Sequence, residues 1–455
     1  MKVLRLYRLA AAALVAGPLI FLFQSCSSSD GDFGLDTRRG EYTSSTAARS
    51  VTPEPDPRRV FIMYSAGFNS LSGYLSQDLS DLAAGWLPSG KRIDGTLLVV
   101  SRHPDGYKDY ATPTSPVLYR MYDDGNGSPV RDTVMVWPSS MNLCEGSSMR
   151  EILTYIQENF PSDNYGMVFS SHASGWLPPG YYNDPTAFEG ASALSPTQPT
   201  RRAPGYAPAA EYYPPIDPFP AVKSIGQDIV GPQDDRRSYE MTAREFARAI
   251  PFHMDYILFD ACLMGCVEVA YELKDVTDYV GFSQAEVLAE GFDYLNLADR
   301  LLGGDSADPL AVCKDYFAQY ENAGSSESFA TISLVETSQM EQLSRVCATL
   351  FDRYNGELAT MSGSGVQGYF RFGRHFFYDL EDIMIHAGAT DDELATLRAA
   401  MDKAIVYKAA TDKFISFDIN VFSGLSMYLP SMGTDYLDDF YRSEVSWNDA
   451  TALVR

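Results

Sequence analysis

Two apolar runs in this chain share one plan, and that plan limits the fold more than any other feature. Residues 165–172 (YGMVFSSH) follow a helix-like stretch at 147–161, and residues 256–262 (YILFDAC) follow another at 241–251. Runs that are apolar throughout are typical of strands buried on both faces of a parallel sheet that helices cover. Because catalytic groups gather at the carboxyl ends of such strands, the polar residues that end the two runs are expected to lie close together.

Other segments extend the same pattern. Residues 58–67 and 95–103 are apolar runs, and the apolar side chains of residues 70–86 between them recur at helical spacing. A strand, a helix and a strand in that order predict a parallel βαβ unit. The spacing predicts more helices at 308–322 and 338–355, and more strands at 132–138, 328–336 and 417–430. We therefore predict an α/β fold with a mostly parallel sheet.

The N-terminal residues have the layout of an export signal. Three basic residues precede an apolar run at 9–23, which is shorter than most membrane spans. The run FLFQSC resembles a bacterial lipobox, so we expect residues 1–25 to be removed and Cys26 to be acylated. The next residues, SSSDGD, resemble the export tags of Bacteroidetes lipoproteins, which implies a lipid anchor in the cell envelope, at the outer membrane. A plain signal peptide or a single anchor helix stays open.

The remaining chain divides into a tether and one folded part. Residues 26–58 are rich in Ser, Thr, Asp, Pro and Arg and have little to bury, so we predict a flexible tether. The folded domain is predicted at 59–455. Within it, residues 177–235 are crowded with Pro, Gly and Tyr, which is typical of an insertion that is either a functional loop or partly disordered.

The net charge and the number of cysteines limit which partners and which chemistry this chain can have. The net charge of -25 argues against nucleic acid as a partner and against a basic membrane-surface patch, because both need clustered Lys and Arg. The negative electrostatic field of this chain favours cationic ligands or calcium. The sequence has no ligand spacing of the EF-hand kind. Of six cysteines, acylation of Cys26 would leave five. An odd number in an exported chain leaves at least one thiol without an intramolecular partner.

His172 and Cys262 end the two apolar runs described first. A reactive thiolate needs a base or a positive dipole. A cysteine where a strand meets a helix is offered helix amides as well as the imidazole of a neighbouring strand end. Core packing is the alternative, and it suits Cys266, one helical turn further on. A zinc site made by both cysteines and a histidine is a weaker alternative, because a second ligand pair is lacking.

These residues resemble a known family. The runs VFSSHASGW (168–176) and ILFDACLMG (257–265), with Glu268 after the second, resemble the clostripain family of cysteine peptidases, in the clan of caspases, gingipains and legumains. SIGQD (224–228), SQAEVLAEGFDY (283–294), YDLEDI (378–383) and GLSMYLP (424–430) continue the resemblance. The resemblance implies a caspase-like three-layer sandwich with helices on both faces, and one catalytic unit over 59–455.

The resemblance also implies a mechanism. It gives His172 the role of general base and Cys262 that of nucleophile, and it places the oxyanion hole at backbone N–H groups of Cys262 and Ala173. Ala173 stands where the clan has glycine, and alanine lacks the freedom to adopt positive φ. A second function therefore stays open, namely a surface binding lipoprotein that retains the peptidase fold without turnover.

Substrate preference and activation follow from the same resemblance. The family cleaves after Arg or Lys, and the acidic residues expected to face that P1 side chain are Asp260, Glu286 and Glu290. For Asp260, capping of the following helix is an equally good interpretation. Clostripain depends on calcium, so calcium is a candidate cofactor. Relatives are zymogens that cut themselves between the catalytic residues, where Arg201 and Arg202 offer basic sites.

Overall fold

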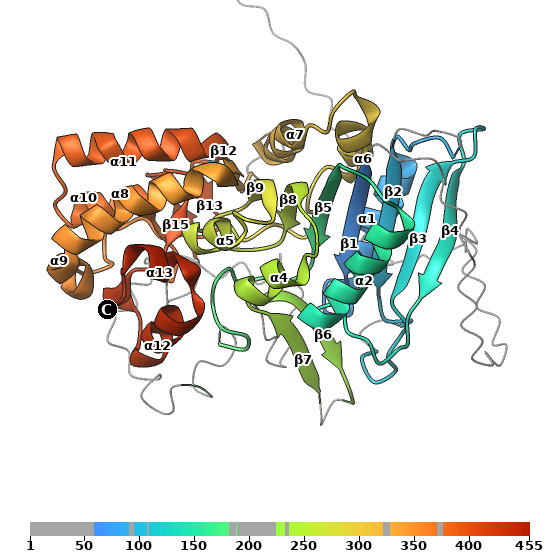
Figure 1. Cartoon of the computed structure of the whole chain (residues 1–455), viewed down its shortest axis with the longest axis horizontal. Coiled ribbons are helices and arrows are strands. Elements are labelled where there is room, and N and C mark those ends of the chain that lie inside the picture. The colour runs from blue at the N-terminus through green and yellow to red at the C-terminus, as the bar shows by residue number, and fades with distance from the viewer. Residues whose placement is uncertain are drawn as a thin grey trace, which may run out of the picture. The chain divides into compact units, whose positions relative to one another are not determined.

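A nine-stranded sheet runs through the molecule, with helices on both of its faces (Figure 1). The computed structural model describes residues 59–90, 95–106, 109–181, 188, 224–232, 236–321, 328–370 and 376–455. All of them belong to a single compact unit, residues 49–455. The strand order is β12-β10-β9-β8-β5-β1-β2-β3-β4.

The centre of the sheet is parallel, and its margins are antiparallel. The parallel strands are β9 (Thr277–Phe282), β8 (Met254–Asp260), β5 (Tyr165–Ser170), β1 (Val60–Ala66) and β2 (Thr96–Arg102). Antiparallel pairing adds β10 (Thr331–Glu336) and β12 (Ile405–Ala410) on one side, and β3 (Val117–Asp123) and β4 (Pro129–Val136) on the other. The predicted mostly parallel α/β sheet is confirmed.

Successive side chains of β1 point to opposite faces of the sheet, which explains why the fold has three layers. Ile62 and Tyr64 point into one apolar core, whereas Phe61 and Met63 point into another. The second core is closed by α1 (Ser72–Ala84), α6 (Tyr294–Ala298) and α7 (Pro309–Glu321). The first is closed by α2 (Gly146–Asn159), α4 (Ala243–Ala249), α5 (Val267–Glu272), α8 (Met340–Arg353), α9 (Asn355–Thr360), α10 (Leu380–His386), α11 (Asp391–Ala404), α12 (Asp435–Glu444) and α13 (Ser446–Thr451).

Short elements complete the described part. Two hairpin-like pairs are β6 (Ile225–Val230) with β7 (Arg237–Met241), and β13 (Lys413–Phe414) with β14 (Phe417–Asp418). A third pair joins β11 (Tyr378–Asp379) to β15 (Ser426–Met427). A π-helical turn follows α6 at 299–303, and 3₁₀ turns lie at 337–339 and 430–432. Among the described residues, every helix is too short or too polar to cross a membrane.

The predicted strand at 417–430 is wrong. Instead of one buried strand, β14 and β15 lie at its two ends and belong to separate two-stranded sheets. The chain between them contains Gly424, whose φ of +96° interrupts any extended run. The edge strand of the main sheet next to β10 is β12, which begins directly after α11.

A buried ion pair fastens β6 to the end of β2. Arg102 Nη1 lies 2.8 Å from Asp228 Oδ2, and both side chains are fully buried. The same carboxylate oxygen accepts the Leu143 N–H at 2.6 Å, and Arg102 also donates to Asn142 Oδ1. Since the ion pair joins residues 126 positions apart, it holds the last part of the insertion, which contains β6, against the N-terminal half.

We expect Arg102→Ala to lower the free energy of unfolding by about 3–5 kcal/mol, because it leaves the Asp228 carboxyl buried without its partner. Urea unfolding followed by tryptophan fluorescence measures this. Arg300→Ala is the matched control, since Arg300 pairs with Asp315 at 2.7 Å with 41% of its side chain exposed. Its cost is expected to be at most about 1 kcal/mol. Equal losses in the two variants would contradict a special role for the buried pair.

Candidate active site

Strand pairing brings His172 and Cys262 to the same edge of the sheet. β5 and β8 are parallel neighbours, and Ser170 is paired with Asp260. His172 and Cys262 each lie two residues beyond that pair, so the two loops leave the sheet at one level. The His172 side chain is buried and the Cys262 side chain is partly exposed. The two apolar runs are thus neighbouring strands that end at the same edge of the sheet, and the closeness of the two side chains stays a prediction.

The loop after β1 supports the imidazole of His172. Ser70 Oγ lies 2.9 Å from His172 Nε2. The neighbouring Asn69 is buried, and its Nδ2 donates to the carbonyls of Ala66 and Gln227 at 2.8 and 2.9 Å. The hydrogen bonds of Asn69 therefore fix the loop that carries Ser70. Sequence analysis did not identify Ser70; the available signal was its position just beyond a third parallel strand of the same sheet.

The backbone around Ala173 shows what alanine does in place of glycine. The Gly226 N–H donates to the His172 carbonyl at 3.0 Å, and the Ser174 N–H donates to the Ser224 carbonyl at 2.8 Å. These two bonds flank Ala173, so its own N–H points away from residues 224–226. The left-handed conformation of this loop is at Gly175, with φ of +61°, and Ala173 has a negative φ. Alanine is therefore unstrained at this position.

Cys262 lies in a turn, and the prediction that a helix begins directly after the strand at this residue is wrong. α5 begins at Val267 with Cys266 as its N-cap, because residues 263–265 bond to the chain that follows β9. Leu263 takes a φ of +61° and donates its N–H to the Ala285 carbonyl at 2.9 Å. The helix amides consequently lie several residues beyond the sulfur.

Backbone groups of Val287 contact the sulfur of Cys262. The Val287 N–H donates to Cys262 Sγ at 3.4 Å, and the thiol lies 3.8 Å from the Val287 carbonyl oxygen. Cys266 differs, because it is fully buried and burial raises the pKa of its thiol well above the ordinary value. Its interpretation as a core residue is confirmed. Within the described residues, no three His, Cys, Asp or Glu side chains are grouped as metal ligands.

Asp260 is the last residue of β8 and faces the α1–α6 layer. Its Oδ2 accepts hydrogen bonds from the Tyr294 hydroxyl at 2.6 Å and from Ser170 Oγ at 3.2 Å. Burial raises the pKa of Asp260 to about 6, and these hydrogen bonds oppose the rise. Because Cys266 caps α5, the interpretation of Asp260 as a helix cap is wrong. Its carboxyl is instead buried and bonded to Tyr294 and Ser170.

The other predicted site residues fall into two groups. Glu286 and Glu290 lie on the loop after β9 that also carries Val287; Glu286 is half-buried and Glu290 is exposed. This loop borders Cys262, so the structure brings the predicted acidic residues to the same edge. Cys26, Arg201 and Arg202 lie outside the described residues.

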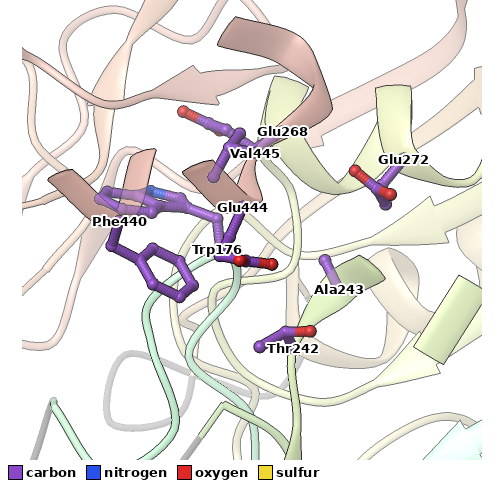
Figure 2. Close-up of a pocket in the computed structure, with 8 residues that line it drawn as sticks. All are labelled: Trp176, Thr242, Ala243, Glu268, Glu272, Phe440, Glu444 and Val445. Carbon is purple, nitrogen blue, oxygen red and sulfur yellow. The ribbon is translucent and has the colours of Figure 1, made fainter. Parts of the chain in front are cut away.

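A small cavity is lined by Trp176, which lies four residues after His172, and by residues of α4, α5 and α12 (Figure 2). Its volume of about 10 Å³ has room for one water molecule and excludes a peptide side chain. Trp176 lines it and packs on the rings of Tyr428 and Tyr441, 4.8 and 5.0 Å away. The buried Glu268 accepts the Tyr441 hydroxyl at 2.8 Å, and burial raises its pKa to about 7. The cavity therefore belongs to the support of the His172 loop.

Comparison with known proteins agrees with this arrangement. The model of the clostripain family matches residues 63–187 and 219–452. An inactive zymogen C11 protease from Parabacteroides distasonis is similar in structure, with 25% identity and a TM-score of 0.67 over 87% of this chain and 98% of that one. A secreted C11 cysteine protease from Bacteroides thetaiotaomicron, in complex with an irreversible peptide inhibitor, has 22% identity and a TM-score of 0.66. That likeness covers 87% of this chain and 99% of the other. A search of curated proteins found no match.

The family match covers most of the chain, and the solved proteases share its caspase-like sandwich. The predicted family, fold and enzyme class are thereby confirmed. With His172 and Cys262 at adjacent strand ends, the chain belongs to the clostripain family and is a cysteine-type peptidase.

Proposed function

We propose that this protein is an endopeptidase that cleaves peptide bonds after Arg or Lys, with Cys262 as the nucleophile and His172 as the general base. The observation that carries the proposal is the register of β5 and β8, which pairs Ser170 with Asp260. It puts a thiol and an imidazole at equal depth on one edge of the sheet. An acidic carboxyl lies two residues before the thiol, where a basic P1 side chain would enter.

The chemistry follows from these groups. His172 takes the proton of the Cys262 thiol, and the thiolate attacks the carbonyl carbon of the substrate. The oxygen that becomes negative accepts hydrogen bonds from the N–H groups of Cys262 and Ala173. The C–N bond breaks as the His172 imidazolium protonates the leaving amine. Water, activated by the same imidazole, then hydrolyses the thioester and regenerates the thiol.

Conformation at Ala173 favours turnover over a purely binding role. The binding alternative depended on the loss of a glycine with positive φ, but Ala173 has a negative φ and an N–H directed away from residues 224–226. Peptide substrates with a basic P1 residue are supported by Asp260, two residues before Cys262, and by Glu286 and Glu290, on the loop whose Val287 contacts the thiol.

Two further parts of the proposal concern residues or ligands outside the described structure. We propose that Cys26 is acylated and anchors the enzyme in the cell envelope, at the outer membrane; incorporation of an alkyne palmitate into wild type but not Cys26→Ala checks this.

Calcium remains a candidate ligand because the net charge is -25, and loss of activity in EGTA that calcium restores checks it.

Exchange of single cysteines tests the nucleophile. Cys262→Ala is expected to lower hydrolysis of fluorogenic peptides with Arg or Lys at P1 by about a thousandfold or more, because no other group replaces the thiolate. Cys266→Ala is the matched control, since its thiol is fully buried in the core beside α5. It should retain most of the activity. Equal loss in both folded variants would sink the assignment of Cys262.

Self-cleavage is expected after Arg201 or Arg202. Both arginines lie in the insertion between His172 and Cys262, and both match the proposed P1 preference. Because β5 and β8 pair across the cut, the fragments should stay associated until denatured. N-terminal sequencing should find a new terminus at Arg202 or Ala203 in wild type and none in Cys262→Ala. An active enzyme that remains one unbroken chain would show that activation does not require this cut.

A further inference from the structure

The loop after His172 packs directly on the turn that carries Cys262. Gly175 has a φ of +61°, and a Cβ added to it would lie 2.5 Å from the carbonyl oxygen of Leu263. Only glycine therefore fits at this contact. Trp176 follows Gly175 in the first segment, and the second segment leads from Leu263 to α5. Contacts that hold Trp176 and α5 in place consequently also affect how the two strand ends are aligned.

Two buried polar atoms in these segments have no hydrogen-bond partner among the described residues. One is the indole nitrogen Nε1 of Trp176, and the other is Oε2 of Glu268 in α5. The two residues are 2% and 1% exposed. Buried polar groups in folded proteins almost always have a partner, and an ordered water often serves as one. Because an indole only donates and an ionised carboxylate only accepts, one molecule that does both can satisfy the two atoms.

Trp176 and Glu268 line the same cavity (Figure 2). They also share two neighbours. Tyr441 packs on the Trp176 ring and donates its hydroxyl to Glu268 Oε1 at 2.8 Å. Tyr428 packs on the same ring and donates its backbone N–H to Oε1 at 2.9 Å. Oε1 thus has two donors, whereas Oε2 remains for a donor inside the cavity.

Size and charge decide which molecule suits the cavity. Its volume of about 10 Å³ fits one water. The other carboxylates in the lining, Glu272 and Glu444, lie 3.6 and 3.7 Å from the guanidinium of Arg244, so their charge is already balanced. The N–H of Trp176 is a donor and would repel a cation. A neutral molecule with donor and acceptor capacity therefore fits better than a metal ion.

We propose that one water molecule occupies this cavity, accepts the Trp176 N–H and donates to Glu268 Oε2, and that this bridge positions His172 relative to Cys262. The bridge joins Trp176, four residues after His172, to Glu268, six residues after Cys262. Trp176 and Glu268 are then positioning residues that act through the backbone of their segments. The water site stands by itself, but its effect on catalysis rests on the proposed function.

The charge of Glu268 gives the bridge a measurable signature. Burial raises the pKa of Glu268 to about 7, and the hydrogen bonds from Tyr428 and Tyr441 oppose the rise. The neighbouring thiol of Cys266 keeps its proton, because burial raises its pKa well above the ordinary value. Glu268 therefore changes charge near neutral pH. Its ionised form attracts the O–H of the water more strongly, which in turn strengthens the bond from the Trp176 N–H.

Indole NMR of the full-length protein tests the link between the two side chains. The chain has four tryptophans, so ¹⁵N labelling gives four indole signals that Trp→Phe variants assign. The Trp176 signal should shift with a midpoint at pH about 7 in wild type, and the shift should vanish in Glu268→Gln. Trp447 is the internal control, since its Nε1 is also buried without a described partner but does not line the cavity. No shift in wild type, or an equal shift in both proteins, would overturn the link.

A crystal structure of the protein tests the water itself. It should show one water oxygen within about 3.2 Å of both Trp176 Nε1 and Glu268 Oε2. An empty cavity, or a direct hydrogen bond between the two side chains, would contradict the proposal.

Peptidase kinetics test the positioning role. Trp176→Phe should lower kcat by about tenfold or more and leave KM within about twofold, because misalignment slows the chemical step more than binding. Trp447→Phe is the matched control, since it removes the same ring and N–H from another buried site. It should retain most of kcat. Equal losses in the two variants, or an effect on KM alone, would refute the positioning role.

The same experiments separate this inference from the proposed function. If wild type shows the water and the titration of the Trp176 signal but cleaves no peptide, the proposed function is wrong and the bridge stands. If wild type cleaves peptides after Arg or Lys and Trp176→Phe has the kcat of Trp447→Phe, the proposed function stands and the positioning role is wrong.

Discussion

The in-register pairing of β5 with β8 is the interaction on which the rest of this site depends. Alternating apolar side chains of the two strands fill both apolar cores, and the pair Ser170–Asp260 sets where the two loops begin. A slip of one residue would turn Asp260 to the opposite layer and move Cys262 away from the level of His172. The apolar sequence of both strands specifies this register, so packing of the cores also aligns the reactive groups.

Loops from distant parts of the chain meet at the edge of the sheet where β5 and β8 end. The loop after β1 brings Ser70 to the imidazole, and the loop after β9 brings Val287 to the thiol. Residues 224–228 bond to the His172 loop and are themselves fastened by the ion pair between Asp228 and Arg102. The last part of the insertion thus supports His172, which precedes the insertion. This arrangement explains physically how a chain cut within the insertion could keep its site intact.

Features that depend on a local run of residues could be predicted from the sequence, whereas features that depend on contacts between distant residues could not. β1, β2, β5 and β8 were predictable because strands buried on both faces are apolar throughout, and their order implied a shared edge. β3 and β9 carry polar side chains on partly exposed faces, so no clear run marked them. The turn between β8 and α5 was not predicted, because the hydrogen bonds that hold residues 263–265 reach residues 283–285, which lie far along the chain.

The central claim is that His172 activates the Cys262 thiol, and the reaction rate of that thiol tests it most directly. Iodoacetamide alkylation at neutral pH, followed by mass spectrometry of the Cys262 peptide in a Cys266→Ala background, compares wild type with His172→Ala. The account predicts that loss of the imidazole slows alkylation by about tenfold or more, because the base that takes the thiol proton is gone. Equal rates in two folded proteins would contradict it, since the two residues would then be neighbours without acting together.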